Sequence, residues 1–172
     1  LENDVDNCPT VSNPGQEDVD GDGDGDACDD ETGPRAHLLM RRGSKGDWLN
    51  NSIVGTKVTG SAKLAMKTSD DFQSVGRGDF DGDGNNDVLL RDVTGNKNGK
   101  FVMYTIVDQT ISDEGDPGLL QDLSYSVVAT SDFDGDARDD LLLRKDDGSW
   151  LMYTLRGLRI KDVGGVNGMP EN

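Results

Sequence analysis

Short apolar blocks recur along this chain at regular intervals. HLLMR at 37–41, DVLLR at 87–91 and DLLLR at 140–144 follow one another at offsets of 50 and 53 residues. Each block leads through a glycine to an aromatic residue, Trp48, Phe101 or Trp150. The aromatic residue opens a six-residue run, which reads WLNNSI, FVMYTI or WLMYTL. This many matches at one spacing indicate three copies of a single unit of about 50 residues.

The character of these runs predicts β-strands. They are short, rich in β-branched and aromatic residues, and separated by Gly, Asp and Asn, which is typical of antiparallel hairpins. In WLMYTL, alternate residues point to opposite faces and both faces carry bulky side chains, so we expect the sheets to be stacked. No stretch shows a sustained period of 3.6 residues, and we therefore expect few helices.

The sequence thus predicts an all-β fold with about three four-stranded antiparallel blades. The copies span about 37–86, 87–139 and 140–172. The last copy shows no clear fourth strand after Arg159, and residues 166–172 are expected to form a tail. Units of this size with about four strands are typical of β-propeller blades.

Two segments connect this pattern to a known family. GDFDGDGNNDVLLRD at 78–92 and SDFDGDARDDLLLRK at 131–145 resemble the FG-GAP/VCBS repeats of integrin α-chain propellers and of many bacterial extracellular proteins. The resemblance covers residues 37–165 and implies propeller blades with bound calcium. Closed propellers use about four to eight blades. Three copies therefore form either a short open stack or a set that another chain completes.

The charge is strongly negative and unevenly distributed. The chain has 172 residues and a formal net charge of −17, from 34 acids and 17 bases. Residues 1–34 contain twelve acids and no Lys or Arg. Nucleic acid and anionic membrane surfaces are therefore not expected as partners, because both require basic surfaces.

Two further features concern the cellular context. No apolar run approaches the roughly 18 to 20 residues that a transmembrane helix needs. The chain starts at Leu1 without an initiator Met, a basic segment or an apolar leader, which indicates a processed or excised fragment.

The acids of the second and third copies fall into nine-residue loops just before a Leu-rich block. Such loops bind hard cations because alternate residues present oxygen ligands, while glycine at position 6 permits a sharp turn. The first loop offers side chains at positions 1, 3, 5 and 9 and a main-chain carbonyl at position 7: Asp79, Asp81, Asp83, Asp87 and Asn85. The second loop offers the equivalent set: Asp132, Asp134, Asp136, Asp140 and Arg138.

Calcium is the predicted cofactor of these loops. Zinc sites favour Cys or His ligands, and magnesium tolerates irregular coordination less well. The second loop departs from the pattern at Ala137, where glycine is expected, which puts its geometry or affinity in question. The alternative interpretation is a pair of solvated acidic turns without a metal. The first copy lacks the loop, since Asp29, Glu31, Gly33 and His37 occupy the corresponding positions, and His37 is expected to be structural.

The acidic arm at 1–36 contains a further candidate loop, DVDGDGDGDACD at 18–29. Its oxygens match positions 1, 3, 5, 7, 9 and 12 of an EF-hand loop: Asp18, Asp20, Asp22, the Asp24 carbonyl, Asp26 and Asp29. The segment DNCPTVSNPGQEDVDGDGDGDACDD at 6–30 resembles a thrombospondin type 3 repeat. This resemblance implies calcium wrapped by aspartate loops and a Cys8–Cys28 disulfide, with free thiols as the alternative. A disulfide would indicate an oxidising, extracellular compartment.

These features predict a non-catalytic, calcium-binding extracellular structural or adhesion module of bacterial type. Its expected partners are further copies of itself in a fibre or ring, joined through open blade edges or the arm, or else a cell-surface protein or a glycan. The alternative function is carbohydrate binding through Trp48, Tyr104, Trp150 and Tyr153, unless these aromatic residues form the blade cores. Catalysis is not expected, because the acids are already explained as ligands and the chain has one His and no Gly-x-Ser-x-Gly motif.

Overall fold

The computed structural model describes residues 6–17, 25, 27–28, 35–43, 46–54, 56–107 and 109–169. Within these ranges the chain forms strands, turns and loops, and no α-helix. The predicted all-β class is therefore confirmed. The strands are β1 (Arg35–Arg42), β2 (Asp47–Val54), β3 (Lys57–Leu64), β4 (Phe72–Gly78), β5 (Asp87–Asp92), β6 (Phe101–Val107), β7 (Thr110–Gly115), β8 (Tyr125–Ser131), β9 (Asp140–Lys145), β10 (Trp150–Leu155) and β11 (Ile160–Gly165).

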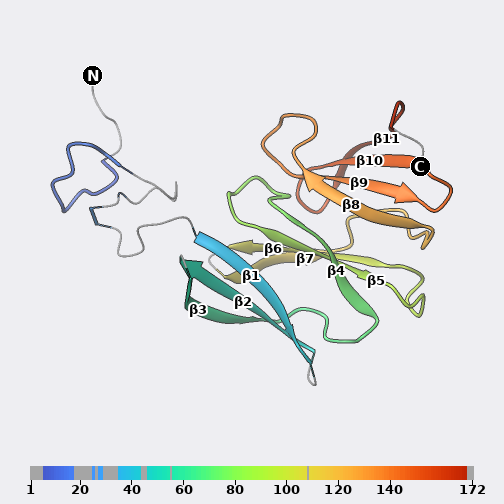
Figure 1. The fold of residues 1–172 in the computed structure, drawn as a ribbon, viewed down its shortest axis with the longest axis horizontal. Coiled ribbons are helices and arrows are strands. Elements are labelled where there is room, and N and C mark those ends of the chain that lie inside the picture. Colours follow the sequence, from blue (N-terminus) through green and yellow to red (C-terminus); the bar gives the residue numbers. More distant parts are fainter. Residues whose placement is uncertain are drawn as a thin grey trace. The chain divides into compact units, whose positions relative to one another are not determined.

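The strands form three blade-like sheets, in each of which neighbours in sequence pair with each other (Figure 1). The first sheet is β1-β2-β3, the second is β4-β5-β6-β7 and the third is β8-β9-β10-β11. The two four-stranded sheets share the same antiparallel register, since Leu89 faces Met103 and Leu142 faces Met152. Both also shift register at equivalent points of their first and last strand pairs. They are therefore equivalent strand for strand.

The four-stranded sheets and the sequence repeats do not begin at the same strand. The repeats begin at a Leu-rich strand, whereas in each four-stranded sheet that strand, β5 or β9, is the second one. The expectation that no clear strand follows Arg159 was wrong, because β11 (Ile160–Gly165) pairs with β10. This strand lies at the edge of its sheet and carries few large apolar residues, so its pattern is weak.

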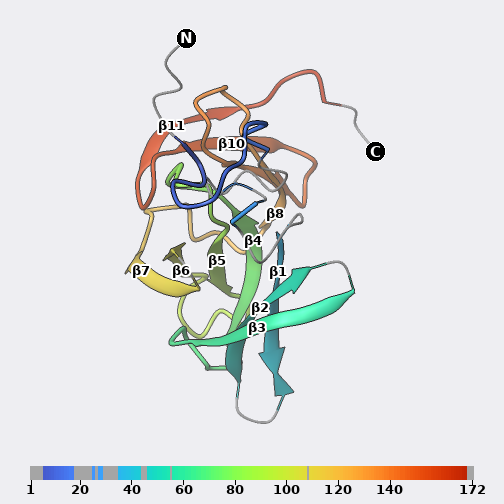
Figure 2. The same ribbon diagram turned by 90° about the vertical axis from the view of Figure 1, so that its left-hand side faces the viewer.

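The chain divides into two compact units. One comprises Leu1–Met40 and Leu49–Lys63, and the other comprises Arg41–Trp48 and Leu64–Asn172. The second unit contains both four-stranded sheets, which lie face to face in both views (Figures 1 and 2).

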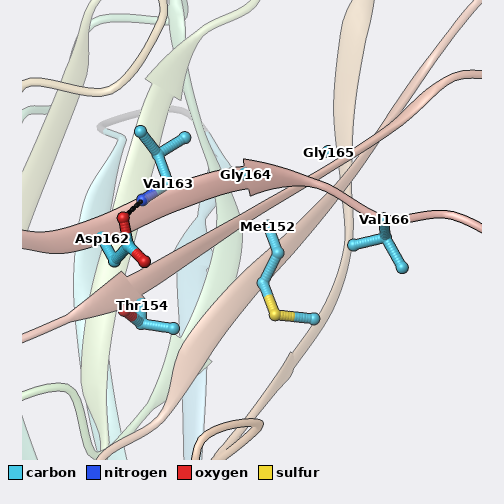
Figure 3. Close-up of a pocket in the computed structure, with 7 residues that line it drawn as sticks. All are labelled: Met152, Thr154, Asp162, Val163, Gly164, Gly165 and Val166. Carbon is cyan, nitrogen blue, oxygen red and sulfur yellow. Dashed lines mark hydrogen bonds between the residues drawn. The ribbon is translucent and has the colours of Figure 1, made fainter.

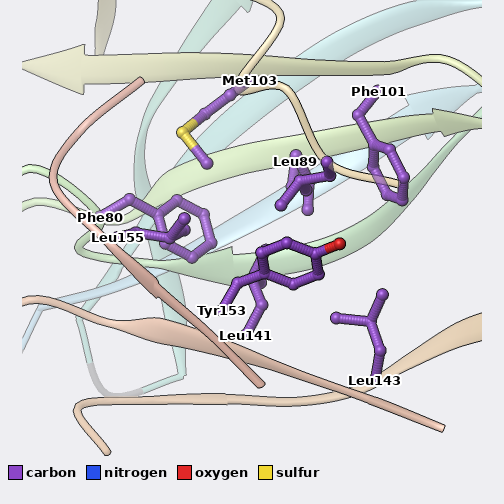
Figure 4. Packing of buried hydrophobic residues seen from close by; sticks show 9 residues of the cluster. Phe80, Leu89, Phe101, Met103, Leu141, Leu143, Tyr153 and Leu155 are labelled. Carbon is purple, nitrogen blue, oxygen red and sulfur yellow. The ribbon is translucent and has the colours of Figure 1, made fainter. Parts of the chain in front are cut away.

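The core of the second unit lies between these two sheets (Figure 4). We call one face of each four-stranded sheet its front face: it is the face that carries Leu89 in the second sheet and Leu142 in the third. The opposite face is the back face. The front of β4–β7 contributes Phe80, Leu89, Phe101 and Met103, and the back of β8–β11 contributes Leu141, Leu143, Tyr153 and Leu155. All eight side chains are buried, so the second sheet's front face is closed by the third sheet's back face.

Three arginines repeat one arrangement along the chain. Arg41 lies over Trp48, Arg91 over Phe101 and Arg144 over Trp150, at 4.7–5.5 Å from guanidinium carbon to ring centroid. Arg91 also donates hydrogen bonds to the main-chain carbonyls of Tyr125 and Asp122. It thereby joins β5 to the segment that opens the next sheet.

Candidate metal centres

The two nine-residue acidic loops occupy equivalent places in consecutive sheets. Residues 79–86 connect β4 to β5, and residues 132–139 connect β8 to β9. Each loop leads directly into a buried central strand.

The first aspartate of each loop shapes the turn. Asp79 accepts hydrogen bonds from the main-chain N–H groups of Gly82 (2.6 Å), Asp83 (3.0 Å) and Gly84 (2.9 Å). Asp132 accepts the equivalent three, from Gly135 (2.6 Å), Asp136 (3.1 Å) and Ala137 (2.9 Å). Both loops therefore fold in the same way, despite Ala137. That residue adopts the left-handed conformation, with φ of 63°, that Gly84 adopts with φ of 87°.

The last aspartate of each loop is fully buried and ties the loop to the sheet. Asp87 accepts from the N–H groups of Phe80 (3.0 Å) and Ile106 (2.9 Å). Asp140 accepts from those of Phe133 (3.0 Å) and Leu155 (2.9 Å). Burial raises the pKa of Asp87 to about 7, against the opposing effect of its hydrogen bonds, and it also raises the pKa of Asp140. A cation beside either carboxylate would favour its charged form.

The structure brings three carboxylates of each loop together. Oxygens of Asp79, Asp81 and Asp87 lie within 4.8 Å of one another, as do oxygens of Asp132, Asp134 and Asp136. Such spacing suits ligands that share one hard cation. In the first loop, burial and the neighbouring Asp83 raise the pKa of Asp81.

Asp83 and Asp140 belong to the predicted ligand sets but lie outside these two clusters. Asp83 accepts a hydrogen bond from the Asn85 N–H (2.7 Å). Asn85 and Arg138 lie at the predicted seventh position, in the turn before β5 and β9. The clusters thus hold six of the eight predicted carboxylates.

The two loops differ in their neighbouring positive charges. The Lys161 ammonium lies 2.8 Å from Asp134 and 2.7 Å from Asp136, and Arg138 lies 3.8 Å from Asp136. The hydrogen bond from Lys161 lowers the pKa of Asp136, and the pKa of Lys161 is raised in turn, first by Asp134 and then by Asp136. Among the described residues, no Lys or Arg forms an ion pair with Asp79, Asp81 or Asp83. The second loop is therefore partly neutralised by the protein itself.

Direct hydrogen bonds join the two loops. Asp139 donates its N–H to the Asp79 carbonyl (2.7 Å), and its carboxylate accepts the Asp79 N–H (2.9 Å). Arg138 donates from Nε to the Asp81 carbonyl (3.0 Å). Sequence reasoning missed Asp139 and Lys161. Asp139 is the additional acid that distinguishes DFDGDARDD from DFDGDGNND, whereas Lys161 is 25 residues from Asp136 and no local spacing signals it.

The arm contains the predicted disulfide, between Cys8 and Cys28, with 5.6 Å between the Cα atoms. Neither cysteine is a free thiol. Beside this bond, the Asn7 carbonyl accepts a hydrogen bond from the Gly25 N–H (2.8 Å). The disulfide and this hydrogen bond join the same two segments of the arm. The predicted ligands of the arm lie outside the described residues: Asp18, Asp20, Asp22, Asp24, Asp26 and Asp29. The same holds for Asp29, Glu31 and Gly33 of the first copy and for the His37 side chain.

Comparisons with protein-family models, with curated proteins and with solved structures find no match to this chain. In the described part of the chain, no helix is long and apolar enough to cross a membrane.

Proposed function

We propose that this chain is a calcium-stabilised, non-catalytic structural module of an extracellular protein. The observation that carries this proposal is the duplication of one hydrogen-bonded carboxylate loop, position by position, before β5 and β9. Each loop gathers three carboxylates with no cation other than Lys161 and Arg138 of the second loop among the described residues. Because like charges at this spacing repel one another, a bound divalent cation would stabilise the loop and the strand that follows.

The disulfide supports the extracellular part of the proposal. Disulfides persist in oxidising compartments and are rare where thiols are kept reduced. The Cys8–Cys28 bond is compatible with an extracellular location. Under this proposal the resemblance to thrombospondin type 3 and FG-GAP/VCBS repeats extends to adhesion or assembly, with neighbouring copies as partners.

The burial of the aromatic residues bears on carbohydrate binding. Trp48, Tyr104 and Tyr153 are buried, and Trp150 is half-buried beneath Arg144. The Tyr104 hydroxyl accepts the Lys67 N–H (3.2 Å) and the Tyr153 hydroxyl accepts the Leu120 N–H (3.2 Å). Buried rings with occupied hydroxyls suit a core role better than stacking on a sugar. This burial favours the structural function over the carbohydrate-binding alternative.

Calorimetry with and without calcium tests the proposal. A site filled at a hundredfold excess over its Kd stabilises a protein by about 2.7 kcal/mol. For a chain of this size that corresponds to a rise in Tm of roughly 5–10 °C. We expect Asp81→Asn and Asp134→Asn each to remove part of this rise, since each removes one carboxylate from a cluster.

Asp113→Asn is the matched control, because Asp113 is an exposed acid on β7 outside both loops. This variant should keep the full response to calcium. Identical melting curves in calcium and in a chelator would overturn the proposal. An equal loss of the response in all three variants would show that calcium acts through general charge screening and would also contradict it.

A further inference from the structure

Within the chain, the front face of one four-stranded sheet is covered by the back face of the next. The second sheet's front face packs on the third sheet's back face, and all its large side chains are buried (Figure 4). The corresponding back-face positions of the second sheet, Val88, Leu90 and Tyr104, are also fully buried. Front and back are thus complementary surfaces within this chain.

The third sheet presents a second front face. By sequence offset and strand register, Val128, Phe133, Leu142, Trp150 and Met152 of this sheet match Val75, Phe80, Leu89, Phe101 and Met103 of the second. Phe80 is 0% exposed, whereas Phe133 is 40% exposed and Val128 is 49% exposed. Trp150 and Met152 are half-buried, and Leu142, at the centre of the sheet, is 7% exposed. Among the described residues, the same apolar pattern is therefore repeated with much less cover at its outer positions.

A shallow hollow lies on this front face (Figure 3). It has a volume of about 190 Å³. Its lining residues are Met152 and Thr154 of β10, Asp162, Val163, Gly164 and Gly165 of β11, and Val166 just after β11. The two glycine positions at the end of β11 carry no side chains that would fill it. The hollow therefore has room for a side chain of another molecule, beside the apolar Met152 and Val166 and the polar Thr154 and Asp162.

In the described part of the chain, the back face of the first sheet is exposed. Leu38 and Met40 on β1 match Leu141 and Leu143 on β9, and Val58 follows Trp48 by ten residues as Ile160 follows Trp150. Leu141 and Leu143 are 0% exposed, whereas Leu38, Met40 and Val58 are 45%, 50% and 63% exposed. The three exposed residues occupy the positions that pack against a front face in the third sheet.

The two segments that form these sheets carry net charges of opposite sign. Residues 35–68, which form the first sheet, contain seven Lys and Arg and one acid. Residues 125–165, which form the third sheet, contain eight acids and six Lys and Arg. This asymmetry favours contact between the first sheet of one molecule and the third sheet of another.

We propose that the front face of the third sheet binds the back face of the first sheet of a second copy of this chain. The proposal deepens the assembly role in the proposed function, by naming the partner and the two surfaces. The contact is heterologous, because each copy uses a different surface. Repetition therefore produces a ring or an open filament rather than an isolated symmetric dimer.

Two single substitutions test the surfaces in the full-length chain. Val58→Asp places an acid on the back face, and Val128→Arg places a base on the front face; both side chains are exposed, so folding should be retained. Sedimentation velocity over a wide concentration range measures self-association. We expect each variant to lower the association constant at least about tenfold, because a charge without a partner is costly to bury in an apolar contact. Val93→Asp, at an exposed apolar residue outside both faces, is the control and should associate like the wild type.

Mixing the two variants gives the sharper result. The Val58→Asp protein keeps an intact front face and the Val128→Arg protein keeps an intact back face, so the two proteins should bind each other although neither associates with itself. A front-to-front or back-to-back contact would instead leave one variant self-associating alone, and this would overturn the proposal. A wild-type protein that stays monomeric, or association that neither variant weakens, would overturn it as well.

The same measurements in calcium and in a chelator separate this inference from the proposed function. A calcium-dependent rise in Tm without self-association would leave the proposed metal role standing and remove the assembly surfaces. Self-association through these faces without any effect of calcium on Tm would support the assembly surfaces and contradict the proposed metal role.

Discussion

At the scale of single residues, position decides what an aspartate does in this protein. Asp79 is half-buried and organises a turn by accepting three main-chain hydrogen bonds. Asp87 is fully buried and connects that turn to β6. Asp81 shares the cluster with both, and its raised pKa reflects its burial and the nearby carboxylates. One residue type thus supplies a turn former, an anchor and a candidate ligand.

Backbone strain at Ala137 in the second loop leads to a pair of opposite predictions, one for each loop. Ala137 adopts a positive φ, which costs an L-residue roughly 1–2 kcal/mol. Ala137→Gly should therefore stabilise the protein, by about 0.5–1 kcal/mol after the greater flexibility of the unfolded chain is included. Gly84→Ala should destabilise it by at least about as much. A Cβ at Gly84 would meet nothing within 4 Å, so the loss of stability would come from the backbone conformation and not from a steric clash. Urea denaturation measures both, and equal stabilities of all three proteins would contradict the argument.

The lysine in the second loop leads to a prediction about affinity. Lys161 occupies space between Asp134 and Asp136, so a divalent cation must displace its ammonium group. The equivalent residue of β7 is Ser112. Lys161→Ser should strengthen calcium binding at the second loop on the order of tenfold, and Ser112→Lys should weaken binding at the first loop by a similar factor. Isothermal titration of calcium into the three proteins measures these changes.

Lys97→Ser is the control for this pair. Lys97 is exposed on the 93–100 loop, and its removal changes the net charge equally. If Lys97→Ser raises the calcium affinity as much as Lys161→Ser does, long-range charge explains the effect. Competition by Lys161 would then be excluded.

Much of the candidate site could be predicted at this scale, because cation loops are local. Positions 1, 3, 5 and 9 lie within one turn, and sequence spacing alone identifies Asp79 or Asp132 as the first. Lys161 and Asp139 could not be predicted in the same way. Their roles depend on which strands and loops become neighbours, and that information is absent from any short segment.

At the scale of elements, central and edge strands differ in how well the sequence reveals them. β5 and β6 are buried on both faces and show up as apolar runs. The edge strands β7 and β11 pair on one side only and include acids and a lysine, such as Asp113, Glu114 and Lys161. Charges on an edge strand limit unwanted pairing with strands of other molecules. They also interrupt the alternation of apolar and polar residues by which a strand is recognised in a sequence.

The β5–β6 connection supplies a prediction about pH. Asp92 is buried and accepts hydrogen bonds from the N–H groups of Thr94, Lys97 and Gly99. Burial alone would raise its pKa, but the hydrogen bonds from Gly99, Lys97 and Thr94 outweigh burial and lower the pKa to about 2. Its contribution to stability is therefore complete above the ordinary carboxyl pKa of 3.8 and is lost as the pH falls through about 2.

Asp92→Asn measures this contribution. The variant should be less stable than the wild type at neutral pH, because an amide replaces a charged acceptor. The difference should shrink between about pH 4 and pH 2, as the wild-type carboxylate becomes protonated. Urea denaturation at a series of pH values provides both curves. A difference that stays constant over this range would contradict the assignment.

At the scale of the whole molecule, the sequence predicts three β units but not where each sheet begins. The strongest matches between copies lie in the central strands, and the sequence repeat therefore starts at each Leu-rich block. The sheets begin one strand earlier, at Phe72 and Tyr125, because those strands pair with the Leu-rich strands that follow them. The bulk on both faces of WLMYTL correctly indicated stacking. The sequence did not reveal which faces remain uncovered, since burial depends on the neighbouring sheet.

The hydrogen bonds that Asp139 and Arg138 make to the Asp79 and Asp81 main chain have a thermodynamic consequence. An ion that orders the first loop also fixes the groups to which the second loop is attached, so part of the entropy cost of the second binding event has already been met. Calcium uptake should accordingly be cooperative, and by linkage each ion must raise the affinity for the other by the same factor.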